Sequence, residues 1–166
     1  MAKAVKPIPE GLHTVTPHLA ISGAAAAIEF YRKAFGAQEM HRSLGPDGKS
    51  VIHAEIRIGD SAIFLADEMP GMGERSPKSL GNTTVVLNLF VEDADALWKR
   101  AVEAGAEIKL PIMDAFWGDR YGLVADPFGH VWALATHKED LTPEELERRA
   151  REFFAKMAQQ PQSQPA

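Results

Sequence analysis

Residues 50–66 have the sequence SVIHAEIRIGDSAIFLA, which predicts two strands joined by a tight turn at Gly59-Asp60. In the first strand, His53, Glu55 and Arg57 alternate with apolar residues, and this alternation places the two sets on opposite faces of a sheet. A Gly-Asp pair between apolar runs is typical of a hairpin, because glycine accepts the positive φ of such turns. The stretch therefore predicts a sheet with a polar row on one face, over which we expect the function to lie.

Composition narrows the class of protein. The chain has 166 residues, 45% of them hydrophobic, and this length suits one domain with a substantial core. It has no cysteine, which excludes disulfides and thiolate metal sites, and its net charge of −5 argues against a nucleic-acid surface. No stretch approaches the roughly 18 apolar residues of a membrane span, and the first residues lack the apolar core of a secretory signal. We therefore expect a cytoplasmic protein with neither nucleic acid nor membrane as a partner.

The chain around the hairpin is duplicated. Residues 24–35 form a predicted amphipathic helix that ends at Gly36-Ala37, and residues 94–104 form a second one that ends at Gly105-Ala106, 69 positions later. The segment IFLA at 63–66 returns as WALA at 132–135 with the same offset. The repeat predicts two βαβββ modules, residues 12–67 and 83–136, joined by a linker loop at 68–82 that is rich in Gly, Pro and Ser.

Further segments flank or complete these modules. Residues 1–11 form a predicted N-terminal arm, and the first strand begins at Leu12, with Pro17 favouring an edge position. Trp132 is predicted to pack beneath the second helix. A capping box at residues 142–145 begins a C-terminal helix at 141–158, and the tail at 159–166 has a disordered composition. The apolar side of that helix predicts that it docks on something; its members are Leu146, Ala150, Phe153, Phe154 and Met157.

Several motifs carry a resemblance to a known family. AIEFYRKAFGA at 27–37 and DPFGHVW at 126–132 resemble the vicinal oxygen chelate superfamily of glyoxalase, bleomycin-resistance and dioxygenase proteins. HAEIRIGD at 53–60, GDRYG at 118–122 and the residues TH-ED at 136–140 resemble its PhnB-like branch. The resemblance covers most of residues 12–137 and implies an α+β fold. In that fold, two tandem βαβββ modules form a curved mixed sheet around a cleft, here followed by the C-terminal helix.

The resemblance also implies where a metal would bind. Metal-dependent members take ligands from the first and fourth strand of each module, and these positions correspond here to Thr16, Phe64, Val86 and Ala133. A hydroxyl and three hydrocarbon groups are not a usual ligand set for Zn, Fe or Ni, and the neighbouring positions offer none either. We therefore expect no cofactor. As an alternative, His18, His53 and Glu55 share a predicted face and could hold Zn, Fe or Mn, or could simply be hydrogen-bonding residues.

Eleven residues are predicted to line the cleft, some apolar and some able to anchor a ligand by a polar group. They are Thr16, His18, His53, Glu55, Phe64, Val86, Asn88, Phe90, Trp117, Arg120 and Ala133. For Trp117 and Arg120 two interpretations stay open. They could form an aromatic and charged rim, or Arg120 could make a structural ion pair at a hairpin.

These observations leave three functional hypotheses. The leading one is a protein that binds a small, partly apolar organic molecule in the cleft between paired modules, without the usual metal centre. The alternative is a metal-dependent lyase or dioxygenase with a non-standard ligand set. In the third, the C-terminal helix joins two copies of the chain and the cleft is vestigial. We expect a homodimer in which the modules pair within one chain or swap between two.

Overall fold

The computed structural model describes residues 6–69, 71 and 73–159, and within them the predicted duplication is present. The first module contains β1 (His18–Ile21), α1 (Ala24–Phe35), β2 (Gln38–Leu44), β3 (Val51–Ile58) and β4 (Ser61–Asp67). The second contains β5 (Val86–Phe90), α3 (Ala94–Glu103), β6 (Glu107–Asp114), β7 (Asp119–Ala125) and β8 (Val131–His137). A short helix, α2 (Pro77–Leu80), lies in the linker, and α4 (Pro143–Gln159) follows the second module.

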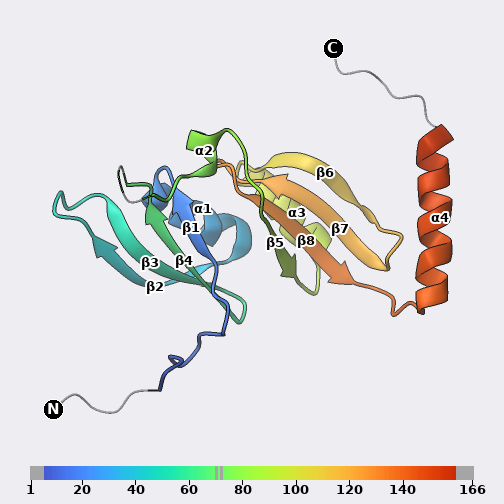
Figure 1. The fold of residues 1–166 in the computed structure, drawn as a ribbon, viewed down its shortest axis with the longest axis horizontal. Coiled ribbons are helices and arrows are strands. Elements are labelled where there is room, and N and C mark those ends of the chain that lie inside the picture. Colours follow the sequence, from blue (N-terminus) through green and yellow to red (C-terminus); the bar gives the residue numbers. More distant parts are fainter. Residues whose placement is uncertain (1–5, 70, 72, 160–166) are drawn as a thin grey trace.

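Each module forms one four-stranded mixed sheet. The strand orders are β1-β4-β3-β2 and β5-β8-β7-β6, with the first pair parallel in each sheet and the others antiparallel. The registers repeat as well, because His18 lies opposite Phe64 and Asn88 lies opposite Ala133. Figure 1 shows the sheets beside one another with β1 and β5 innermost and α1 and α3 behind them. The predicted α+β fold with two tandem modules and a C-terminal helix is confirmed.

The first strand is shorter than predicted. It was expected from Leu12, but β1 begins at His18. Proline has no backbone N–H, so Pro17 can continue the ladder only through its carbonyl, which accepts a hydrogen bond from Phe64 N at 2.9 Å. β1 lies at the edge of its sheet, as the proline indicated.

The hydrophobic core is shared by the two modules. α1 and α3 pack against each other and against one face of the sheets, where alternate strand residues such as Ala54, Ile56 and Leu134 are buried. The Trp132 ring, expected beneath the second helix, lies 4.7 Å from Phe35 and 5.2 Å from Tyr31 between ring centroids, both on α1. The helices thus leave the opposite face of each sheet uncovered, and we call it the open face.

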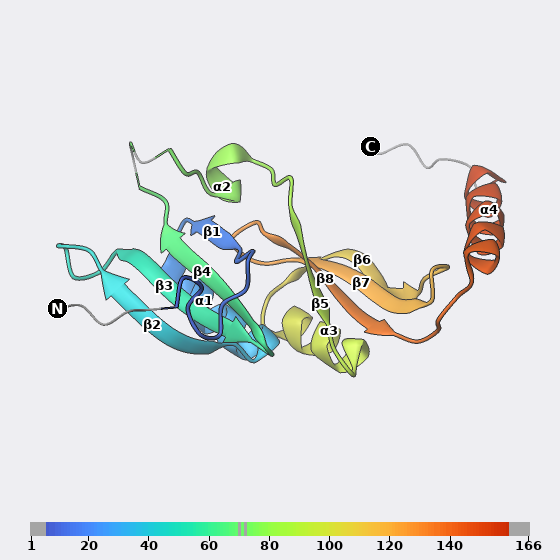
Figure 2. The same cartoon turned by 60° about the horizontal axis from the view of Figure 1, so that its bottom comes forward.

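α4 stands apart from this body. Figures 1 and 2 show it beyond the far end of the second sheet, on the side of the open face, separated from α1 and α3. None of its residues is buried. Among the described residues, no helix combines the length and apolar character needed to cross a membrane. The predicted N-terminal arm and C-terminal tail fall partly outside the described residues, at 1–5 and 160–166.

Candidate functional site

The open face of the first sheet gathers the polar row around a phenylalanine. The half-buried side chains of His53 and Glu55 alternate with core residues along β3, and Phe64 lies beside them on β4. The centroid of the His53 ring is 5.0 Å from that of Phe64 and 6.3 Å from that of His18 on β1. His18, His53, Glu55 and Phe64 therefore share one surface. Thr16 precedes β1, and its hydroxyl donates to His13 O at 3.4 Å.

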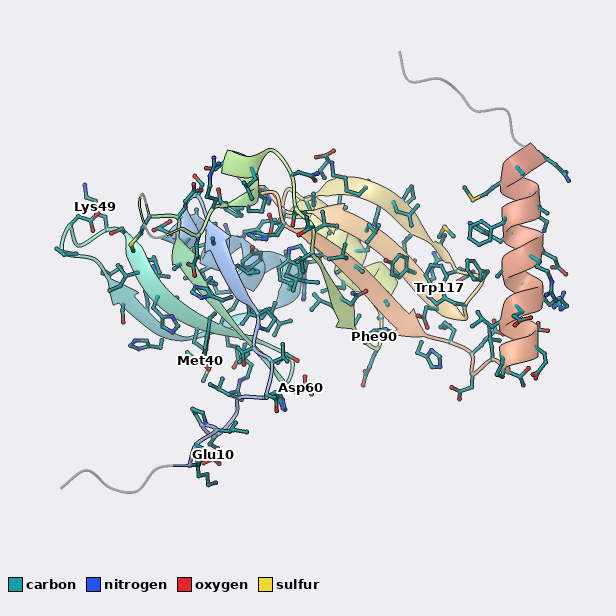
Figure 3. All side chains as sticks on the ribbon, in the orientation of Figure 1. Glu10, Met40, Lys49, Asp60, Phe90 and Trp117 are labelled. Atoms are coloured by element: carbon teal, nitrogen blue, oxygen red, sulfur yellow. The ribbon has the colours of Figure 1, made fainter. Side chains whose placement is uncertain are left out.

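The open face of the second sheet is mostly hydrocarbon. Val86, Asn88 and Phe90 alternate along β5 with side chains exposed, and Ala133 lies beside Asn88 on β8. The Asn88 amide donates back to Val86 O at 3.4 Å. Figure 3 labels Phe90 on β5 and Trp117 in the β6–β7 turn, both toward the end of the sheet at which β8 finishes. The predicted residues that lie on these strands thus fall on two open faces rather than on one continuous wall.

Two cavities lie where the modules meet. One of about 600 Å³ separates β1 from the segment that leads into β5, and linker residues between Glu74 and Thr84 border it. We call it the seam cavity. The other, of about 770 Å³, lies between the β3–β4 turn and β5, and its walls include Asn88 and Phe90. The remaining walls of the seam cavity are Pro17, His18, Leu19, Ala20, Val85, Leu87 and His130.

Arg120 does not join the predicted site. Its guanidinium pairs with Asp95 of α3 at 2.8 and 2.9 Å, which places it on the helix side of its sheet, and it also lies 3.4 Å from Asp114. The ion pairs with Asp95 and Asp114 raise the pKa of Arg120, so the group stays charged. Trp117 lies in the β6–β7 turn, where its indole N–H donates to Asp119 at 2.9 Å and its ring meets Tyr121 edge-on. The structural ion pair that the sequence left open is present.

His137, which the sequence alone did not single out, connects two of the three PhnB-like motifs, GDRYG and TH-ED. Asp119, nearly buried, accepts a hydrogen bond from His137 Nδ1 at 2.8 Å, and His137 Nε2 lies 3.0 Å from Asp140. Both contacts raise the pKa of His137, that with Asp140 most. The backbone N–H groups of Lys138 and Glu139 donate to Gly118 O at 2.9 and 3.0 Å. The proximity of the motifs GDRYG and TH-ED is a tertiary property that neither motif reveals alone.

The chain is similar to several known proteins. The family model of the Glyoxalase/Bleomycin resistance protein/Dioxygenase superfamily matches residues 11–134. The chain belongs to this superfamily. An uncharacterized protein of Mycobacterium tuberculosis is 47% identical over 136 residues, covering 80% of this chain and 79% of the relative. An uncharacterized Arabidopsis thaliana protein is 34% identical over 128 residues, covering 73% of this chain and 76% of the relative.

Solved structures agree with the superfamily fold. The crystal structure of that Arabidopsis gene product superposes with a TM-score of 0.61 at 28% identity, covering 76% of this chain and 99% of the other. A PhnB protein from Bacillus cereus superposes with a TM-score of 0.59 at 18% identity, covering 75% and 99%, and this likeness concerns the fold. The resemblance to the superfamily is confirmed, and a PhnB protein is among the proteins that share its fold.

The metal positions of the superfamily do not fit this chain. Phe64 and Ala133 lie on the open faces with carbon side chains, as does Val86, and Thr16 offers only a hydroxyl that bonds to backbone. Within the part of the chain that the structure describes, no three His, Asp or Glu side chains are arranged to hold a metal ion. The alternative set of His18, His53 and Glu55 shares a surface without forming such a group. No chemical step is therefore derived through a metal.

Proposed function

We propose that the chain binds a small, partly apolar organic molecule between its two modules. The observation that carries the proposal is the seam cavity, whose volume of about 600 Å³ suits a drug-sized ligand. Its walls combine carbon from Leu19, Ala20 and Leu87 with the imidazoles of His18 and His130. A mostly apolar wall with a few convergent polar groups is the common design of ligand sites.

The two histidines give this cavity different polar anchors. His130 is buried, and burial lowers its pKa, so its ring is neutral at pH 7 and its Nε2 donates to Ala20 O at 3.3 Å. His18 is exposed at the cavity mouth, beside the open face that carries Phe64. A ligand that fills the seam could thus place a ring against Phe64 while a polar group meets His18.

Binding is tested with a cavity-filling variant. The probe is 8-anilinonaphthalene-1-sulfonate, whose fluorescence rises in apolar sites, titrated into the folded full-length chain. Ala20→Phe fills the seam cavity and is expected to weaken dye binding at least about tenfold, because the site loses its volume. Ala155→Phe adds the same ring on the exposed polar side of α4 and should leave binding unchanged. Equal affinities in both variants would place the dye elsewhere and remove the support for this site.

A metal analysis distinguishes the metal-dependent alternative from binding without a metal. Protein purified without chelator is analysed for Zn, Fe and Mn, alongside the His53→Ala variant. Substoichiometric metal in both the wild type and His53→Ala agrees with a protein that binds its organic ligand without a metal ion. Stoichiometric metal that disappears in His53→Ala would instead favour a lyase or dioxygenase with a non-standard ligand set.

A further inference from the structure

α4 is attached to the body along one side only. Arg149 pairs with Glu139 at 2.7 Å, and the Phe153 ring lies 5.1 Å from that of Phe116 in the β6–β7 turn. These contacts orient the helix, yet none of its 17 residues is buried. Figure 3 shows side chains of α4 pointing toward the β6–β7 turn, where Trp117 is labelled.

A stripe of apolar residues on α4 stays largely exposed, although the Phe154 ring lies 6.0 Å from that of Phe116 between centroids. Leu146, Phe154 and Met157 are 39%, 59% and 55% exposed. Together with Ala150 they are spaced by four, four and three residues, which aligns them along one side of a helix. The stripe lies next to the side that carries Arg149 and Phe153, so attachment to the body covers it only in part, at Phe154. Large exposed apolar groups in a row mark an interaction surface.

The charges on the polar side of α4 indicate which kind of partner the stripe binds. Residues 143–159 contain four Glu and four Lys or Arg, so the helix is neutral overall. Arg148 pairs with Glu145 at 2.7 Å and also with Glu152, and Arg151 pairs with Glu147 at 3.3 Å. An anionic membrane or a nucleic acid attracts a surplus of basic residues, which this helix lacks. A protein surface of matching apolar shape and balanced charge fits better.

We infer that the stripe pairs with the same stripe of a second copy, with the two α4 helices antiparallel. The stripe is self-complementary about Ala150. In an antiparallel pair centred there, Leu146 meets Phe154 of the second copy, and Pro143 meets Met157 of the second copy. Ala150 meets its own equivalent on the twofold axis, where a small side chain lets the helices approach closely.

The charges beside the stripe complement each other in the same arrangement. Glu147 and Arg151 flank the stripe on the side away from Arg149, three residues before and one residue after the centre at Ala150. In an antiparallel pair centred there, Glu147 and Arg151 of the second copy differ by two residues along the axis, roughly 3 Å, which their long side chains span. Antiparallel pairing therefore places Glu147 near Arg151 of the second copy, and the reverse pair forms by symmetry. Charged pairs that flank an apolar helix seam set orientation and partner choice.

The first test is the mass of the full-length chain in solution, measured by light scattering after gel filtration. The expected mass is twice the 18.1 kDa of one chain. Leu146→Glu with Phe154→Glu should weaken the dimer at least about 100-fold, because twofold symmetry places each change in the interface twice. Ala155→Glu with Gln159→Glu, on the exposed opposite side, should not. A monomeric wild type, or a dimer indifferent to the first pair, would overturn the inference.

The second test addresses the antiparallel register. Since the chain has no cysteine, Ala150→Cys introduces a single thiol, which oxidation should link across the twofold axis. Ala155→Cys is the matched control and should remain unlinked. Glu147→Arg alone and Arg151→Glu alone should each raise the dimer dissociation constant, and the double exchange should restore it. Dimers that link equally through Ala155→Cys, or that ignore the charge exchange, would contradict this register.

Discussion

At the scale of single residues, one buried carboxylate joins the two modules. Asp126 is 4% exposed, and its Oδ2 accepts hydrogen bonds from Tyr31 Oη at 2.7 Å and Trp132 Nε1 at 2.9 Å. Its Oδ1 accepts from the backbone N–H groups of Phe128 and His130. Burial and the neighbouring Asp126 raise the pKa of Tyr31 well above its usual value, so Tyr31 keeps its proton and donates a hydrogen bond to this carboxylate. Four donors satisfy a charge that would otherwise be costly to bury.

The first prediction concerns this carboxylate. Asp126→Ala should lower the free energy of unfolding by about 3 kcal/mol, since it leaves the Tyr31 hydroxyl and the Trp132 N–H buried without an acceptor. Tyr31→Phe removes one donor and leaves three, so its expected cost is about 1 kcal/mol. Urea unfolding followed by circular dichroism measures both. Similar stability of Asp126→Ala and wild type would show that the network does not stabilise the fold.

The second prediction concerns pH and His137. Its pKa is raised in the folded chain by Asp140 and Asp119, so protonation favours the folded state. The stabilisation is complete below the ordinary histidine pKa of about 6.5 and is lost as pH rises through the higher folded value. Wild type should therefore exceed His137→Gln in stability at pH 6 and lose this advantage by pH 9. A stability advantage of wild type over His137→Gln that grows with pH would contradict the raised pKa of His137. NMR titration of the His137 ring measures this pKa directly.

At the scale of elements, the last strand of each module caps the helix of the same module. α1 has glycine at its N-cap, and Asp67 at the end of β4 accepts hydrogen bonds from the backbone N–H groups of Gly23, Ala24 and Val51. In the second module Thr136, 69 positions later, accepts from Ala94 N at 2.8 Å. Exposed N–H groups at a helix start need such acceptors, and a side chain from a neighbouring strand can supply them.

The third prediction compares these two caps. Asp67→Ala removes the acceptor of three backbone donors and should cost about 2 kcal/mol of unfolding free energy. Thr136→Val keeps the shape, removes the acceptor of one donor and should cost about 1 kcal/mol. Thermal unfolding of both variants shows which substitution destabilises the chain more. A larger loss of unfolding free energy for Thr136→Val than for Asp67→Ala would contradict the predicted capping role of Asp67.

At the scale of the whole molecule, the two modules share one hydrophobic core. Trp132 of β8 packs on Tyr31 and Phe35 of α1, and Phe128 lies within 6.5 Å of Tyr31 between ring centroids. Separation of the modules would expose these rings together with the α1–α3 contact.

The fourth prediction follows from the shared core. A fragment of residues 83–159 should not fold alone, because its Trp132 and Phe128 lose the aromatic side chains of α1. The intact chain should unfold in a single cooperative transition. Circular dichroism and proton NMR of the fragment decide the question, and a dispersed spectrum with a cooperative melt would show that the second module is independent.

Much of the architecture was predictable from the sequence. The repeat at an offset of 69, the glycine stops and the polar row of β3 are local patterns, so periodicity and turn chemistry reveal them without knowledge of long-range contacts. The superfamily motifs then indicated how the modules are built. The start of β1 was wrong because alternation extended the predicted strand through Pro17, where the backbone has no N–H to donate.

By itself, the sequence determined the two βαβββ modules, the carbon side chains at the superfamily's metal positions and the amphipathic C-terminal helix, because each depends on residue type and spacing along the chain. Tertiary structure alone decided that Asp126 bonds to Tyr31, that Arg120 pairs with Asp95 away from the open face, and that Asp119 meets His137. It also decided that the apolar stripe of α4 stays exposed. Such partners come from distant parts of the chain, and only packing of the modules determines which groups become neighbours.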